Sequence, residues 1–219
     1  MPILLIADDH PLFREALKGA VARGLGAAEI HEAADAASLF TLVETHPEAD
    51  LLLLDLHMPG AEGFGTLVQL RSQHPQLPVM VVSAHEQPSV IRRALDHGAA
   101  GFIPKSSDSE TLIQAIRSVL DGDLWLPADL GDTPGVSPRE ADIADRIREL
   151  TPQQLRVLNM LAEGLLNKQI AYELSVSEAT VKAHMTAVLR KLGASNRTQA
   201  VVLASQLTLK PQPLPPDDA

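Results

Sequence analysis

Five short strand-like runs, four of them mainly apolar, are separated by amphipathic stretches and constrain the fold of this chain more than any other feature. The runs are ILLIA (3–7), EIHEAA (29–34), LLLLD (51–55), PVMVVSA (78–84) and AGFIPK (100–105). Short continuous runs of this kind are typical of strands buried on both faces, which occur in parallel sheets covered by helices. The alternation therefore predicts an α/β domain with a doubly wound, five-stranded parallel sheet.

Acidic residues stand directly after two of these runs. Asp8 and Asp9 follow the first run, and Asp55 ends the third. Right-handed crossovers bring the carboxyl ends of parallel strands to one edge, so the three carboxylates should lie together. Because like charges this close need a cation among them, we expect a hard divalent ion with oxygen ligands.

The fourth and fifth runs add a hydroxyl and an ammonium at the same edge. Ser83 closes the fourth run and Lys105 the fifth. A carboxylate nucleophile, a metal, a hydroxyl donor and a cation together suit phosphoryl transfer onto an aspartate. Structural alternatives remain for each residue. Asp8 and Asp9 could cap the next helix, Ser83 could initiate a helix, and Lys105 could be a solvated loop residue.

The order DD, D, S and K, each after a strand, resembles the receiver domain of two-component response regulators over residues 1–122. DLHMPG (55–60) and FIPK (102–105) are the most specific pieces. The resemblance implies a flavodoxin-like fold with Asp55 as the phosphoacceptor. It also implies Mg²⁺ bound by Asp8, Asp9, Asp55 and the backbone carbonyl of His57.

The same resemblance implies roles for residues on the later strands. Ser83 and Lys105 would contact phosphoryl oxygens, and Ser83 and Phe102 would be the switch residues. Phe102 is also an ordinary core candidate, so any switching would act through packing. Zinc ligation by His57 together with His10 or His85 is an alternative, but these histidines lack the spacing of a zinc motif.

Charge changes sign along the chain. The formal net charge is −10, yet residues 151–209 carry six Lys and Arg against three Asp and Glu. Residues 1–122 carry eight basic residues against sixteen acidic ones. A basic C-terminal part is compatible with binding to nucleic acid. The net charge of the whole chain conceals this difference between its two parts.

The second half of the sequence predicts helices. Residues 123–149 are assigned to a linker that includes a connecting helix. The stretch DGDLWLPADLGDTPG (121–135) has no sustained hydrophobic period, which is typical of a linker. The connecting helix follows it, with Ser137 as N-cap and Pro138 in the first helical position. Further helices are predicted from Thr151–Pro152 to Gly164, over 168–174 and over 178–192, with a turn at 175–177. Residues 210–219 are Pro-rich and acidic, and we expect a disordered tail there.

The segment from Leu150 to Ala204 resembles the helix-turn-helix domain of the NarL/LuxR type, and we assign residues 150–209 to this all-α domain. The pieces NKQIA (167–171), SEATVKAH (177–184) and LGASNRTQA (192–200) occur in that family's order. Helical spacing agrees, because apolar residues of the two motif helices would pack against each other. These are Ile170, Leu174, Val176, Val181 and Leu189. The outer face of 178–191 is polar and basic and suits the major groove.

Lys182 is the strongest candidate for a contact with a base edge. Other candidates for phosphates or bases are Thr180, His184, Thr186, Arg190 and Lys191, and Lys168 would contact the DNA backbone. Alternatives are an exposed helix lysine at 182, packing of His184, and favourable charges at a helix C-terminus for the last two. Thr186 and Ala183 depart from the residues common in the family, which weakens any transfer of target sequence. The resemblance places a dimer contact on the last helix, at Val201 and Ala204.

We therefore expect a response regulator and not an enzyme. A partner histidine kinase would phosphorylate it, and a homodimer would bind promoter DNA to regulate transcription. The start MPILLIADD is wrong for a secretory signal and no apolar run reaches membrane-span length, so we expect a cytoplasmic protein. Rival hypotheses are a phosphohydrolase, which would need an acid at position 57, and a DNA-binding protein with a vestigial pocket.

Overall fold

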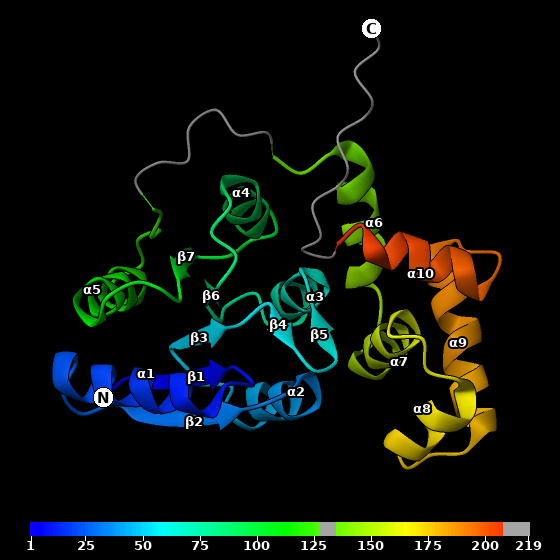
Figure 1. Cartoon of the computed structure of the whole chain (residues 1–219), viewed down its shortest axis with the longest axis horizontal. Helices are drawn as coiled ribbons and strands as arrows, with labels where there is room; N and C mark the ends of the chain where they lie inside the picture. The colour runs from blue at the N-terminus through cyan, green and yellow to red at the C-terminus, as the bar shows by residue number, and fades with distance from the viewer. Residues whose placement is uncertain (128–134, 208–219) are drawn as a thin grey trace, which may run out of the picture.

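The computed structural model describes residues 1–127 and 135–207 of the chain. Its N-terminal part is a parallel sheet in the order β2-β1-β3-β6-β7, wrapped by helices (Figure 1). The strands are β1 (Ile3–Ala7), β2 (Glu29–Ala33), β3 (Leu51–Leu54), β6 (Val79–Ser83) and β7 (Gly101–Pro104). Each strand lies on one of the five predicted runs, which confirms the predicted α/β class.

Helices cover both faces of the sheet because the strand side chains alternate between them. Leu5 and Ala7 face an apolar cluster completed by α2, α3 and α4. Leu4 and Ile6 face a second cluster completed by α1 and α5. These helices are α1 (Pro11–Gly24), α2 (Ala36–Thr45), α3 (Gly65–Gln73), α4 (Pro88–Asp96) and α5 (Ser109–Leu120).

A short antiparallel hairpin follows β3, and the sequence analysis missed it. Strand β4 (His57–Met58) pairs with β5 (Ala61–Glu62). Pro59 and Gly60 occupy the turn, where Gly60 has a φ of +71°, a conformation open to glycine without steric cost. The stretch DLHMPG is therefore a strand end followed by a turn.

The predicted linker is not structureless at its start. Trp125 pairs with the edge strand β7, since its carbonyl accepts the Phe102 N–H at 3.1 Å and its N–H reaches the Ala100 carbonyl at 3.2 Å. A Cβ on Gly101 would lie 3.1 Å from the Trp125 oxygen, so a larger residue at this position would require Trp125 to shift. Residues 128–134 of the predicted linker and the predicted tail at 210–219 fall outside the described residues.

The C-terminal part is helical, with ends that follow its capping residues. It contains α6 (Pro138–Arg148), α7 (Pro152–Ala162), α8 (Asn167–Glu173), α9 (Glu178–Leu192) and α10 (Arg197–Ser205). Ser137, Thr151 and Ser177 each accept a backbone N–H as the N-cap of α6, α7 and α9. None of the helices in the described parts of the chain combines the length and apolar character that crossing a membrane requires.

The two parts share one apolar cluster. Buried residues of α6, α7, α9 and α10 join the cluster on the α2–α3–α4 side of the sheet, and Figure 1 shows α6 and α7 beside α3. Hydrogen bonds fasten this contact: Gln69 Nε2 donates to the Leu150 carbonyl at 2.7 Å, and the Phe64 N–H donates to the Leu207 carbonyl at 2.8 Å. The helical part is thus docked on the sheet domain.

Candidate functional site

The carboxyl ends of the parallel strands gather the predicted acid site. Asp8 follows β1, Asp55 follows β3, Ser83 ends β6 and Lys105 follows β7. Strands β1 and β3 are neighbours although β2 lies between them in sequence, so this edge contains the point where strand order reverses. Open α/β sheets bind their ligands at such a point.

Lys105 joins the two buried acids. Its Nζ lies 2.7 Å from Asp55 Oδ2 and 2.7 Å from Asp8 Oδ2. Both aspartates are only 2% exposed. The second oxygen of Asp55 accepts the His57 N–H at 3.1 Å, and Oδ1 of Asp8 accepts the His10 N–H at 2.8 Å. The two carboxylates are therefore held in fixed orientations by the backbone and by one shared ammonium.

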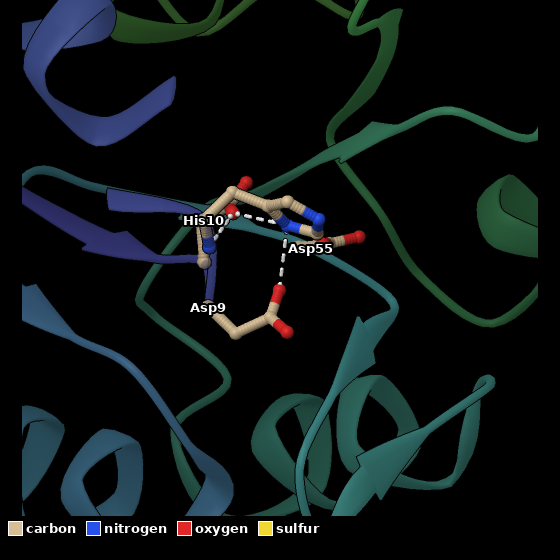
Figure 2. Close-up of side chains that lie close together, drawn as sticks. Asp9, His10 and Asp55 are labelled. Carbon is tan, nitrogen blue, oxygen red and sulfur yellow. Dashed lines mark hydrogen bonds and ion pairs between the residues drawn. The ribbon is translucent and has the colours of Figure 1, made fainter. Parts of the chain in front are cut away.

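The pocket holds more negative charge than its lysine can balance. Asp9 and His10 lie at its mouth, beside Asp55 (Figure 2). Burial raises the pKa of Asp55 above its ordinary value, and the neighbouring Asp8 adds to this, although the hydrogen bond and charge of Lys105 act in the opposite direction. Burial lowers the pKa of Lys105, but its bonds to Asp55 and Asp8 outweigh this and raise it overall. One ammonium, bound to two of the three nearby acids, leaves room for a further cation.

The donor set fits a divalent metal ion. One ligand atom from each of Asp8, Asp9, His10 and Asp55 lies within 4.8 Å of the others. Three of the four are carboxylate oxygens, the donors that hard ions such as Mg²⁺ prefer. The His57 ring is exposed and its backbone N–H bonds Asp55. Its carbonyl remains a predicted ligand.

Ser83 and Phe102 lie on the last two strands beside the pocket. Ser83 is fully buried, its Oγ accepts the His85 N–H at 3.1 Å, and its carbonyl accepts the Lys105 N–H at 2.9 Å. Phe102 is fully buried in the cluster that faces α4. The core interpretation of Phe102 is confirmed, while the switch roles of both residues remain predictions.

The structural alternatives for the acids and the serine are wrong. Helix α1 has His10 as its N-cap residue, with no side-chain cap, so neither Asp8 nor Asp9 caps it. Helix α4 begins at Pro88 after Gln87, too far along the chain for Ser83 to initiate it. The Lys105 alternative fails as well, because its ammonium is bound by two buried carboxylates.

Helix α9 presents the predicted polar face to solvent. Lys182, Thr186 and Arg190, which are four residues apart along the helix, are all exposed. Thr180 and His184 are half-buried, and Lys168 is exposed on α8. The receiver-like part covers none of the first three, so this face is open in the docked arrangement.

The inner face of α9 agrees with the prediction except at its end. Ile170, Leu174, Val176 and Val181 form one cluster with α7. Leu189 does not belong to it and packs instead against the cluster shared with α6 and α7. Leu189 is eight residues after Val181, which rotates it about 80° around the helix at 3.6 residues per turn.

The ammonium of Lys191 is hydrogen-bonded within its own domain. Its Nζ donates to the Glu149 carbonyl at 2.6 Å and to Gln154 Oε1 at 2.8 Å, and the side chain is half-buried. These bonds join the end of α9 to the start of α7. Lys191 is therefore omitted from the DNA-contact residues proposed below.

The predicted dimer residues are only partly accessible to a second chain. Val201 and Ala204 of α10 are half-buried against the apolar clusters of the chain, whereas Val202 between them is 51% exposed. The outward side of α10 thus runs through Val202. The sequence analysis did not single it out.

A third buried carboxylate, which was not predicted from the sequence, lies between the domains. Glu140 of α6 is 7% exposed, and its Oε1 accepts Arg93 Nε at 2.7 Å and lies 3.0 Å from His97 Nε2. Burial alone would raise the pKa of Glu140, but the bonds from His97 and Arg93 outweigh it and hold the pKa below its ordinary value. Its only sequence signal is a glutamate on the face of α6 that also carries Ile143 and Ile147.

Arg93 makes further contacts around this carboxylate. Its Nη2 donates to the Gln206 carbonyl at 2.8 Å, beyond the end of α10. Its guanidinium also lies 4.6 Å from the centre of the Phe64 ring. One side chain of α4 therefore touches α3, α6 and the end of α10.

Comparison with known proteins places both parts of the chain. Residues 4–117 match the response regulator receiver domain, and residues 148–204 match the luxR family of bacterial regulatory proteins. A glycerol metabolism activator of Pseudomonas putida is 43% identical over 210 residues, which cover 93% of this chain and 95% of that protein. The nitrate/nitrite response regulator protein NarL of Escherichia coli is 34% identical over 93% of this chain and 94% of its own length. A solved structure of two RcsB dimers bound to two parallel DNAs has a TM-score of 0.56 at 22% identity, covering 94% and 99% of the two chains.

Proposed function

Because the chain belongs to the response regulators that join a receiver domain to a luxR-type DNA-binding domain, we propose that Asp55 accepts the phosphoryl group. It is a transcriptional regulator and not an enzyme. A partner histidine kinase would supply the phosphoryl group, in the cytoplasm. Promoter DNA would be the target.

One observation supports Asp55 above the other acids. Asp55 follows the central strand β3, between Asp8 after β1 and Ser83 at the end of β6, and its Oδ2 is bound by Lys105. Lys105 and the His57 N–H hold this carboxylate in a fixed orientation, which favours attack on a phosphorus atom brought to the rim. Lys105 would move from the carboxylates to a phosphoryl oxygen, and Ser83 would donate its hydroxyl to another.

Mg²⁺ is the resident ion that we propose, held by Asp8, Asp9, Asp55 and the carbonyl of His57. When bound it supplies positive charge that offsets the charge of the incoming phosphoryl group. Support comes from the oxygen-rich donor set and from the charge that Lys105 leaves unbalanced.

The acceptor can be tested with a small acyl phosphate and Mg²⁺. The Asp55→Asn protein should show no labelling on a phosphate-affinity gel, because the amide is not a nucleophile toward phosphorus. The matched control is Asp123→Asn, an exposed acid at the start of the linker just after α5, which should label like the natural protein. Label retained by Asp55→Asn would place the acceptor elsewhere.

DNA reading is assigned to the exposed face of α9. Lys182 would contact a base edge, while Thr186 and Arg190, with Thr180 and His184 at the margin and Lys168 from α8, would contact phosphates or bases. Lys182→Ala should weaken binding to a specific site by about 1–3 kcal/mol, measured by fluorescence anisotropy at fixed salt. Lys18→Ala, the same charge change on α1 of the receiver part, should leave the affinity unchanged. Equal affinity of all three proteins would remove Lys182 from the interface.

We also propose that the phosphorylated chain pairs as a homodimer through α10. Val201 and Ala204 would contribute where they reach the surface, and Val202 offers the most exposed apolar side chain of the helix. Two linked domains bind DNA far more tightly than one, since the second contact becomes intramolecular. Val202→Glu should keep the phosphorylated protein monomeric in sedimentation velocity, and a dimer in this variant would exclude the α10 surface.

The signal would pass from pocket to interface through α4. This helix follows β6, which ends at Ser83, and it carries Arg93 and His97 to the interdomain carboxylate of Glu140. A shift of α4 after phosphorylation would weaken these bonds and release α6 and α10. Small-angle scattering should then give a larger radius of gyration for the phosphorylated protein than for Asp55→Asn treated in the same way.

A further inference from the structure

His10 stands at the mouth of the acid pocket with its ring turned toward the carboxylates (Figure 2). Its Nδ1 lies 2.7 Å from Asp9 Oδ1 and 3.3 Å from Asp8 Oδ1. The His10 side chain is 65% exposed, so it borders the solvent, whereas Asp8 behind it is only 2% exposed. An imidazole nitrogen is thus part of the same ligand group as the three aspartates.

The backbone fixes this position. His10 is the residue before α1, its N–H is bound by Asp8 Oδ1, and its carbonyl accepts the N–H groups of Phe13 and Arg14. Arg14 in turn donates to the Asp8 carbonyl at 2.6 Å and pairs with Glu32 of β2. The first turn of α1 is therefore tied to the end of β1 and to β2.

Other histidines near the rim do not offer the same set. His57 and His85 lie with their ring centres 5.8 Å apart. Within residues 1–127 and 135–207, the group of Asp8, Asp9, His10 and Asp55 is the one set of three or more such side chains with ligand atoms close enough to share an ion. His10 is the only imidazole in that group.

We infer that His10 is an additional metal ligand, which strengthens the preference of the pocket for transition ions such as Zn²⁺ over Mg²⁺ beyond that of an all-oxygen site. Mg²⁺ prefers oxygen donors and gains little from an imidazole, whereas Zn²⁺ binds nitrogen readily. The inference rests on the proposed function only in placing the resident ion among the same three aspartates. It adds that the identity of the ion depends on the residue at position 10.

The test measures metal binding and needs no phosphorylation. His10→Asn keeps a residue that favours a helix N-terminus and replaces the nitrogen ligand by an amide. In competition with a chromogenic chelator, the variant should bind Zn²⁺ about tenfold or more weakly, while Mg²⁺ affinity from calorimetry changes less than about twofold. His85→Asn is the matched control and should change neither affinity.

Pulsed electron paramagnetic resonance of bound Mn²⁺ provides a direct readout. The natural protein should show the hyperfine coupling of a directly bound ¹⁴N nucleus, and His10→Asn should lose it. Unchanged Zn²⁺ affinity, absence of the nitrogen coupling, or an equal loss of Zn²⁺ and Mg²⁺ affinity would each overturn the inference. Circular dichroism verifies folding, and His10→Gln replaces His10→Asn if that variant unfolds.

These outcomes separate the inference from the proposed function. If Asp55 is labelled by acyl phosphate but position 10 does not affect Zn²⁺ binding, the inference alone is overturned. If Asp55 is not labelled while the nitrogen coupling is present, the metal ligand stands and the phosphoacceptor assignment falls.

Discussion

Asp55 and Glu140 are both buried carboxylates with cationic partners, yet their electrostatic situations are opposite. Asp55 shares one ammonium with Asp8, and its pKa is raised, mainly by burial. Burial also acts on Glu140, but its own two partners, His97 and Arg93, lower its pKa overall. The Asp55 site contains more acids than cations, whereas at the other site a single acid is bound by two donor side chains.

The ratio of cations to acids separates a reactive site from a structural one. A pocket with unbalanced negative charge attracts a metal ion and keeps its carboxylate in need of a further partner. A single carboxylate bound by a guanidinium and an imidazole needs no further cation, and it fixes the geometry of the groups around it. The Asp55 carboxylate can therefore exchange its hydrogen-bond partners, whereas the Glu140 carboxylate keeps the bonds that it has.

The largest expected effect comes from breaking the satisfied site. Glu140→Gln removes the carboxylate that binds the partly buried Arg93 and the buried His97, and should lower the free energy of unfolding by about 3–5 kcal/mol in urea titrations. Asp145→Asn is the matched control on the same helix, since it removes only an exposed pair with Arg148 and should cost less than about 1 kcal/mol. Equal losses in the two variants would contradict the difference drawn between buried and exposed pairs.

The stability that the acid pocket loses when its lysine is removed should be restored by a metal ion. Lys105→Met leaves Asp8 and Asp55 without their shared ammonium and should lower stability by about 2 kcal/mol in the presence of a chelator, less than at Glu140 because solvent at the rim screens the charges. Added Mg²⁺ should restore most of this loss, since a divalent ion can take the place of the missing charge. The Glu140→Gln protein should not respond to Mg²⁺, and a response there would remove the distinction between the sites.

Much of the acid pocket was predictable because each of its residues stands at or just after the end of a strand. Apolar runs such as LLLLD locate strand ends, and parallel strands bring those ends together whatever the sequence between them. The helix starts at Pro138 and Pro152 were predictable for a similar local reason, namely a capping residue followed by proline.

The Glu140 site was not predictable because it depends on contacts between distant segments. Its partners Arg93 and His97 lie 47 and 43 residues earlier, on a helix of the other domain. No period or motif in one segment specifies how another docks on it. The pairing of Trp125 with β7 was missed because a segment rich in Asp, Gly and Pro can still add backbone hydrogen bonds to a sheet edge.

A smaller effect of opposite sign is expected at Asp55. A raised pKa means that the fold favours the neutral carboxyl, so the ionised form present at pH 7 costs stability. Asp55→Asn should therefore raise the free energy of unfolding by an amount on the order of 1 kcal/mol in a chelator at pH 7. Asp123→Asn should have no effect, and a destabilised Asp55→Asn protein would show that the bond to Lys105 outweighs burial.

The smallest effect, and the sharpest comparison, lies in the pH dependence of the two variants. Glu140 has a lowered pKa, so its contribution is present above the ordinary value of 4.5 and is lost as pH falls through the pKa of the folded state. Asp55 has a pKa raised above 3.8, so its cost disappears as pH falls through that raised value. Urea titrations from pH 7 to pH 4 measure the gap in free energy of unfolding between the natural protein and each variant. The gap for Asp55→Asn should therefore disappear at a higher pH than the gap for Glu140→Gln. Each gap should change by no more than about 1.4 kcal/mol per pH unit, because each variant removes a single proton site. Gaps that close together would mean that the two carboxylates share one electrostatic environment, against the contrast in their partners.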